Sequence, residues 1–150
     1  MCKKGAGLIE GGIMANAKVL IADDEKDILD VMEKKIAAAG YSVITASDGE
    51  EAWERIKKDL PDVVVLDLTM PKMDGLDVLK NLREDKSIVK WIPVVIVSAR
   101  GELEDMKKGF SLEADHYITK PCDIEAILKG IRLMVSLIPQ RKSKLEMGQS

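Results

Sequence analysis

The feature of this sequence that most restricts its fold is an alternation of short apolar runs with longer segments of helical periodicity. Five short runs, rich in β-branched and aliphatic residues, predict strands at 18–22, 42–46, 63–67, 94–97 and 116–119. Between and after them, apolar residues recur at the spacing of a helix face. Strands that alternate with helices predict a parallel sheet covered by helices on both faces.

Five helices are predicted from residues at three- and four-residue spacing. These residues are Ile28, Met32, Ile36 and Ala39; Ala52, Trp53 and Ile56; Leu76, Leu79 and Leu82; Leu103, Met106 and Phe110; and Ile124, Ile127, Ile131, Val135 and Ile138. Gly40 is predicted to close the first helix, Asp48 lies where the second opens, and Asp123 is predicted to cap the last.

The order of these elements leaves few topologies. Right-handed crossovers favour an α/β fold of the flavodoxin-like (βα)5 type, a doubly wound parallel sheet with strand order 2-1-3-4-5. We expect one domain over residues 17–138. Residues 1–16 are rich in glycine and lack periodicity, so they are predicted to be a flexible leader, and residues 139–150 a polar C-terminal tail.

Composition narrows the class of protein. The chain has 150 residues, 46% of them hydrophobic and 33% charged, which is typical of one soluble globular domain. A net charge of −3 gives no electrostatic reason for direct binding to nucleic acid or acidic membranes. No apolar run approaches the roughly 18 residues that a membrane helix requires. Cys2 and Cys122 have no metal or redox spacing, which is typical of a cytoplasmic protein.

Polar side chains end or follow four of the five predicted strands. Asp67 ends the third strand, Asp23 and Asp24 follow the first, Ser98 follows the fourth, and Lys120 follows the fifth. In the order 2-1-3-4-5 these strand ends meet at the crevice where such sheets bind ligands. Each residue alone has an ordinary explanation, as a helix cap, a turn residue or a solvated lysine. Together they predict a binding site.

The chemistry of that site follows from its charges. Three crowded carboxylates repel one another, so a bridging cation is expected, and oxygen ligands of this kind suit Mg²⁺. Asp24 and Asp67 would be the main ligands of the ion, and Asp23 would support them from close by or through a water molecule. A carboxylate there can attack phosphorus to form an aspartyl phosphate, while Lys120 neutralises the phosphoryl oxygens and Ser98 donates to one of them. No Gly-rich phosphate loop follows the first strand, which disfavours a bound flavin or nucleotide.

These residues belong to a larger set whose spacing is specific. The set comprises Asp23-Asp24, Asp67 with Thr69-Met70-Pro71-Lys72-Met73-Asp74-Gly75, Ser98-Ala99, Tyr117 and Lys120-Pro121. It resembles the receiver domain of two-component response regulators, the CheY-like family. The resemblance covers about residues 17–138, and the strand order 2-1-3-4-5 is already known for this family.

The resemblance implies a role for each site residue. It implies that Asp67 is the phosphoacceptor, which receives a phosphoryl group from the phosphohistidine of a histidine kinase or phosphotransfer protein. It implies that Asp23, Asp24 and the backbone carbonyl of Thr69, together with Asp67, hold Mg²⁺. Lys120 would form a salt bridge with the phosphoryl group.

The family also implies a switch. Ser98 stands at the switch hydroxyl and Tyr117 at the switch aromatic; the Lys120–Pro121 peptide bond is expected to be cis, and Gly75 is expected to be structural. Such a chain is a phosphoacceptor that assists its own phosphorylation and dephosphorylation rather than an enzyme.

The implied output is a changed surface made by the fourth helix, the fifth strand and the last helix. A downstream protein or a second copy of the domain is expected to dock there, with Met106 and Phe110 as apolar candidates and Lys107 and Lys108 at the rim. The 12 residues after Ile138 are too few for a DNA-reading module. The chain is therefore expected to be either a single-domain regulator or a receiver cut from a longer protein.

Two other classes remain open. Haloacid dehalogenase-type phosphatases also use a strand-end aspartate with Mg²⁺, but they need a second aspartate two residues later, where this chain has Thr69. Activity on small phosphoesters would distinguish them. A receiver fold can also serve as a constitutive docking or dimerisation module, usually after loss of the acids or the lysine, and here all are present.

Overall fold

Five strands pair in parallel into one sheet, in the order β4-β3-β5-β6-β7. Their bounds are β3 Lys18–Ala22, β4 Ser42–Ala46, β5 Val63–Asp67, β6 Val94–Ala99 and β7 His116–Lys120. The computed structural model describes residues 9–10, 13–14, 16–99 and 114–148. Counted along the chain from Lys18, this is the order 2-1-3-4-5, so the predicted flavodoxin-like fold is confirmed.

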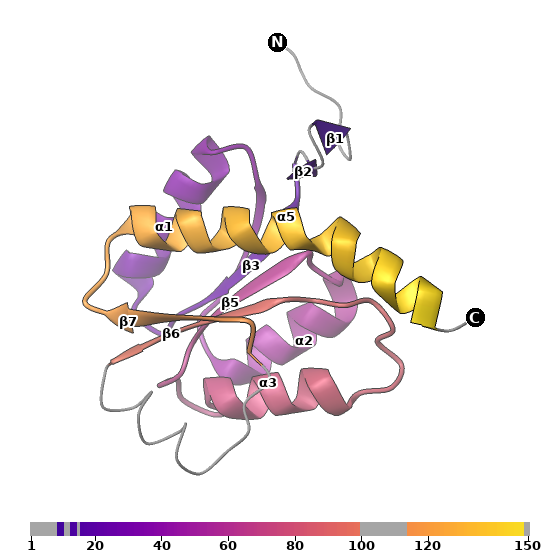
Figure 1. The fold of residues 1–150 in the computed structure, drawn as a ribbon. Helices are drawn as coiled ribbons and strands as arrows, with labels where there is room; N and C mark the ends of the chain where they lie inside the picture. The colour runs from indigo at the N-terminus through magenta and orange to yellow at the C-terminus, as the bar shows by residue number, and fades with distance from the viewer. Residues whose placement is uncertain (1–8, 11–12, 15, 100–113, 149–150) are drawn as a thin grey trace.

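Helices cover both faces of the sheet. Their bounds are α1 Lys26–Ala38, α2 Gly49–Asp59, α3 Gly75–Glu84 and α5 Ile124–Gly148. Figure 1 shows α1 and α5 on one face, and α2 and α3 on the other. The helix expected around Leu103, Met106 and Phe110 lies outside the described residues. Of the helices in the described part of the chain, none has an apolar stretch that is long enough to span a bilayer.

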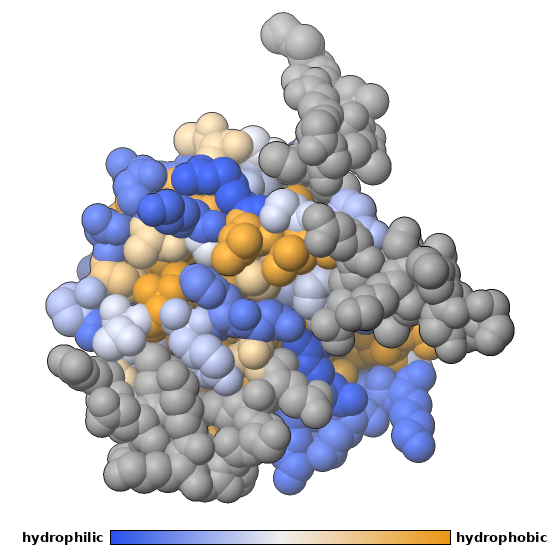
Figure 2. Space-filling model, viewed as in Figure 1, coloured by the Kyte–Doolittle hydropathy of each residue, from blue (hydrophilic) through white to orange (hydrophobic). Residues whose placement is uncertain are grey.

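The alternation of side chains along each strand divides the core into two layers. Val19 and Ile21 belong to the cluster beneath α1 and α5, whereas Leu20 and Ala22 belong to the cluster beneath α2 and α3. All five residues of β5 are buried. A strand buried on both faces is apolar along most of its length, which explains the unbroken apolar run before Asp67. The surface over α1 and α5 mixes charged and apolar side chains (Figure 2).

The predicted helix ends agree with the structure. Gly40 follows α1 with φ +106°, a conformation that glycine adopts without strain. Asp48 caps α2 by accepting from the backbone N–H of Glu51, and the Asp123 carboxylate accepts from the N–H of Ala126 in α5. These caps hold the helices that flank the carboxyl edge of the sheet.

Two predictions about the ends of the chain differ from the structure. Ile9–Glu10 (β1) pairs antiparallel with Ile13–Met14 (β2), where the sequence predicted no regular structure. The last helix was predicted to end at Ile138, but α5 continues through Pro139 to Gly148. A proline inside a helix loses one backbone hydrogen bond and clashes with the preceding turn, but the residues after it are mostly good helix formers, which favours continuation of the helix.

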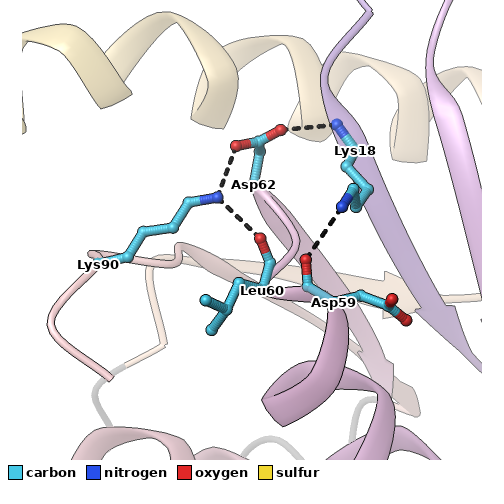
Figure 3. Close-up of polar contacts among 5 residues, drawn as sticks. All are labelled: Lys18, Asp59, Leu60, Asp62 and Lys90. Carbon is cyan, nitrogen blue, oxygen red and sulfur yellow. Dashed lines mark hydrogen bonds and ion pairs between the residues drawn. The ribbon is translucent and has the colours of Figure 1, made fainter. Parts of the chain in front are cut away.

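A charged network ties the amino ends of the strands together, at the edge opposite the predicted site (Figure 3). Asp62 Oδ2 accepts from the backbone N–H of Lys18 at 2.7 Å, and Asp62 Oδ1 pairs with Lys90 Nζ at 2.8 Å. Lys90 also donates to the carbonyl of Leu60, and Lys18 Nζ donates to the carbonyl of Asp59. One carboxylate thus joins the start of β3 to the segment that leads into β6.

Replacing Asp62 should therefore destabilise the fold. In Asp62→Ala the Lys18 N–H and the Lys90 ammonium each lose an acceptor, and we expect the free energy of unfolding to fall by about 1–3 kcal/mol in urea titrations. Asp85→Ala, which removes a carboxylate whose hydrogen bonds to Ser87 are open to solvent, is the control and should change stability far less. Equal stability of Asp62→Ala and the wild-type chain would contradict the account of this network.

Candidate functional site

Four strands of the sheet bring the predicted site residues together at their carboxyl ends. Asp23 and Asp24 follow β3, Asp67 is the last residue of β5, Ser98 lies near the end of β6, and Lys120 ends β7. One carboxylate oxygen from each of the three aspartates lies within 4.8 Å of the others. Lys120 Nζ lies 3.1 Å from Asp67 Oδ2. The acidic cluster and the ammonium therefore form one site.

Two of the three carboxylates are buried. Asp23 and Asp67 are 4% and 5% exposed, whereas Asp24 is exposed. Burial raises the pKa of Asp67, although the hydrogen bond and charge of Lys120 and the N–H of Thr69 oppose the shift. Burial also raises the pKa of Asp23, although the hydrogen bond from the N–H of Glu25 opposes the shift. Both buried acids hold a proton more readily than a free aspartate, and a nearby cation would favour their charged form.

Lys120 supplies a positive charge at the same place. Burial alone would lower the pKa of its ammonium, but the hydrogen bond and charge of Asp67, with the charges of Asp23 and Glu25, outweigh burial, and the pKa of Lys120 is raised. The group is therefore charged at neutral pH. The next peptide bond, Lys120–Pro121, is cis.

The loop from β5 to α3 orients Asp67. The backbone N–H of Thr69 donates to Asp67 Oδ1 at 3.2 Å, and the N–H of Gly75 donates to the carbonyl of Leu68 at 2.9 Å. A Cβ on residue 75 would lie 2.6 Å from the Asp67 carbonyl oxygen, so only glycine allows this close approach. Asp74 caps α3 by accepting from the N–H of Asp77.

The donor set fits a hard divalent cation. Three carboxylates offer oxygen atoms within 4.8 Å of one another, and one of them, Asp24, is open to solvent. Mg²⁺ prefers oxygen ligands and keeps several of its waters, so a half-open site of carboxylates suits it. No histidine or cysteine belongs to this group of acids. The residues present therefore fit Mg²⁺ better than Zn²⁺.

The two predicted switch residues lie on neighbouring strands. Ser98 is fully buried near the end of β6, and Tyr117 lies half-buried on β7, opposite Ile96. Because Ile96 and Ser98 are two residues apart, Tyr117 faces the same side of the sheet as Ser98. Burial raises the pKa of the Tyr117 hydroxyl, and the charge of Asp115 adds to the shift.

The predicted crevice at the strand ends has a volume of about 690 Å³, and it extends from the acids along α1, which the sequence did not reveal. Its floor is apolar, and α1 lines one wall with Ile28 and Val31, which are 42% and 54% exposed. Helical spacing had placed Ile28 on the core face, but Leu29 is buried instead. The crevice is lined by Ile21, Ala22, Asp23, Glu25, Asp27, Ile28, Val31, Met32, Val65, Asp67, Val97, Lys120, Pro121, Cys122, Ile124 and Ile127.

Comparison with known proteins agrees with this geometry. Residues 19–132 match the family model of the response regulator receiver domain. The chain is 42% identical over 119 residues to the alkaline phosphatase synthesis transcriptional regulatory protein PhoP of Bacillus subtilis, covering 77% of this chain and 48% of that protein. It spans about half the length of the curated relatives it matches.

Solved structures show the same fold. The Francisella response regulator 1452 receiver domain matches with a TM-score of 0.70 and 36% identity, over 80% of this chain and 97% of that one. The chemotaxis response regulator CheY4 of Vibrio cholerae matches with a TM-score of 0.71 and 32% identity, over 79% of this chain and 98% of that one. By its sequence, its strand order and its family match, this chain belongs to the receiver domains of two-component response regulators, which are phosphorylation-dependent signalling switches.

Proposed function

We propose that Asp67 is the phosphoacceptor of this receiver domain. The observation that carries the proposal is the contact of Lys120 Nζ with Asp67 Oδ2, 3.1 Å long, beside two further carboxylates. An oxygen of Asp67 attacks phosphorus, and the bond from phosphorus to the donor's leaving atom breaks. Lys120 then balances the negative charge of the phosphoryl oxygens, and the Ser98 hydroxyl donates to one of them.

Mg²⁺ is the cofactor that this site is built for. Asp23, Asp24 and Asp67 would hold it through their carboxylates, and Thr69 through its backbone carbonyl. When bound, the ion supplies positive charge at the phosphoryl oxygens. The chain's own contribution is to hold Asp67 in place by the Thr69 N–H, and to keep Lys120 charged beside it.

The phosphodonor is the phosphohistidine of a histidine kinase or phosphotransfer protein. The phosphorus–nitrogen bond of the phosphohistidine breaks as Asp67 is phosphorylated. Such a donor must reach Asp67, which lines the crevice beside α1. The exposed Ile28 and Val31 on the wall of that crevice give a protein donor an apolar surface to contact. The chain acts as a phosphoacceptor and not as an enzyme on other substrates, in keeping with Thr69 in place of a second aspartate.

Calorimetric titration with Mg²⁺, with and without beryllofluoride, tests the metal and phosphoryl parts of the site together. Beryllofluoride stands in for the phosphoryl group. We expect weak binding of Mg²⁺ alone and tighter binding with beryllofluoride, because its fluorides complete the shell of the ion and contact Lys120. Absence of Mg²⁺ binding under both conditions would overturn the proposed site.

The output is a switch through Ser98 and Tyr117. Arrival of the phosphoryl group draws Ser98 toward Asp67, and the Tyr117 ring turns into the space that Ser98 leaves. This couples a local change of charge to the surface formed by β7, α5 and the segment predicted as the fourth helix, which lies outside the described residues. A downstream protein or a second copy of the domain docks there, without direct contact to nucleic acid or membrane. The free energy that couples phosphorylation of Asp67 to docking of the partner is expected to be about 1–3 kcal/mol.

Ser98→Ala should separate phosphorylation from output. The variant keeps Asp67 and Lys120, so it should still accept a phosphoryl group, but it lacks the hydroxyl that moves. We expect amide exchange over residues 102–120 to change with beryllofluoride in the wild-type chain and to change much less in Ser98→Ala. Ser136→Ala serves as a control and should respond like the wild-type chain, because the Ser136 hydroxyl is half-buried and donates to the carbonyl of Leu133 within α5. Identical wild-type protection with and without bound beryllofluoride would rule out this switch.

A further inference from the structure

The glycine that begins α2 lies against the loop between β5 and α3. The N–H of Gly49 donates to the carbonyl of Pro71 at 3.4 Å. A Cβ on residue 49 would overlap the carbonyl oxygen of Met73 and lie 2.7 Å from the Met73 Cβ. Real Cβ atoms essentially never approach other atoms within 3.0 Å, and the obstacle here is backbone. Any side chain at residue 49 must therefore displace either the loop or the start of the helix.

An ion pair joins the same two elements. Asp48 accepts from the N–H of Glu51 through Oδ1, which caps α2, and its Oδ2 lies 3.6 Å from Lys72 Nζ. Lys72 has φ +72°, a left-handed conformation that is unfavourable for lysine. The loop is thus held against α2 in a shape that its own residues do not favour.

That loop leads directly out of the site. It starts at Asp67 and carries Thr69, whose N–H donates to Asp67 Oδ1. At its far end a Cβ on Gly75 would lie 2.6 Å from the Asp67 carbonyl oxygen. The loop is therefore closely confined at two places, by Gly75 against the end of β5 and by Gly49 against Pro71 and Met73.

We propose that Gly49 is a positioning residue for Mg²⁺ binding and phosphoryl transfer at Asp67. Its missing side chain lets the loop lie directly on the start of α2, and this packing holds Thr69 and Asp67 in the geometry that binds the ion. The inference rests on the proposed function of Asp67 and of the Thr69 carbonyl, and it adds a residue on another helix that contacts neither the metal nor the phosphoryl group.

The test compares Gly49→Ala with Gly40→Ala. Gly40 lies at the amino edge of the sheet with φ +106°, and a Cβ there would meet nothing within 4 Å. Gly40→Ala should lower the melting temperature through backbone strain but leave the Mg²⁺ dissociation constant unchanged. Gly49→Ala should weaken Mg²⁺ binding roughly tenfold to a hundredfold, which is the loss of metal affinity typical when groups that orient the ligands are disturbed. Calorimetry is done where circular dichroism shows each variant to be fully folded.

Wild-type Mg²⁺ affinity in a folded Gly49→Ala would overturn the inference. If that variant does not fold, Lys72→Gly decides instead, because glycine relieves the left-handed strain at residue 72 while the ion pair to Asp48 is lost. Removing a positive charge from the loop should by itself favour binding of a cation, so weaker binding would have to come from the displaced loop. Unchanged or tighter binding in Lys72→Gly would overturn the inference. Failure of the wild-type chain to bind Mg²⁺ would instead overturn the proposed function.

Discussion

Asp67→Asn should incorporate no phosphoryl group from a small phosphodonor such as acetyl phosphate. Asparagine has nearly the same shape as aspartate, but its amide oxygen is a far weaker nucleophile and carries no charge to pair with Lys120. The loss should be complete, because the two neighbouring acids, Asp23 and Asp24, are assigned to metal binding. Incorporation is measured with radiolabelled phosphodonor in the presence of Mg²⁺.

Asp74→Asn is the matched control for this prediction. Asp74 lies on the same loop and caps α3 by accepting from the N–H of Asp77, a role that asparagine fills about equally well. It should be labelled like the wild-type chain. Equal labelling of Asp67→Asn and the wild-type chain would show that the phosphoacceptor is a different residue.

Asp24→Ala should lose Mg²⁺ binding, and with it phosphorylation. Asp24 is the exposed member of the acidic cluster, so its side chain contributes little to packing. Without it the ion loses a charged ligand, and we expect Mg²⁺ affinity to fall at least about tenfold, which is about 1.4 kcal/mol. Without metal, the variant should be at least as stable as the wild-type chain, because one of three crowded carboxylates is gone.

Asp27→Ala provides the electrostatic control. Asp27 lies in the first turn of α1 and lines the crevice, but it does not belong to the acidic cluster. It changes the net charge by the same amount and should keep nearly wild-type Mg²⁺ affinity. Calorimetry measures the Mg²⁺ affinity, and urea titration measures the free energy of unfolding. Retained Mg²⁺ affinity in Asp24→Ala would show that the ligands are wrongly assigned.

The sheet could be predicted from the sequence because its three central strands, β3, β5 and β6, are buried over most of their length. In β5 every residue is buried, so the run Val63 to Leu66 has to be apolar, and Asp67 stands out as the first charge. Once the strand order is known, parallel pairing alone brings Asp23, Lys120 and Asp67 to one edge. The proximity of these residues could therefore be predicted without knowledge of any side-chain contact.

Features that depend on tertiary packing were not predictable in the same way. Spacing assigned Ile28 to the buried face of α1, yet Leu29 is buried and Ile28 lies on the wall of the crevice, because adjacent residues at the edge of a helix face share the same periodicity. Residues 139–150 were predicted to be a polar tail, although α5 continues through Pro139 to Gly148.

Gly49 is the most instructive of the features that sequence reasoning missed. It was interpreted only as part of a helix start, and nothing in the local pattern shows that the carbonyl of Met73 lies against it. The contact joins α2 to a loop that follows the next strand, so it arises only when the sheet has formed. A residue on one helix that packs against a functional loop elsewhere in the chain leaves no signal in its local sequence pattern.

Intact-mass and tandem mass spectrometry of the wild-type chain, after incubation with acetyl phosphate, tests the central claim most directly. With Mg²⁺ present, we predict the addition of one phosphoryl group and its location on the peptide that contains Asp67; with the metal chelated, we predict no addition. A phosphoryl group on any other residue, or none in the presence of Mg²⁺, would contradict the account.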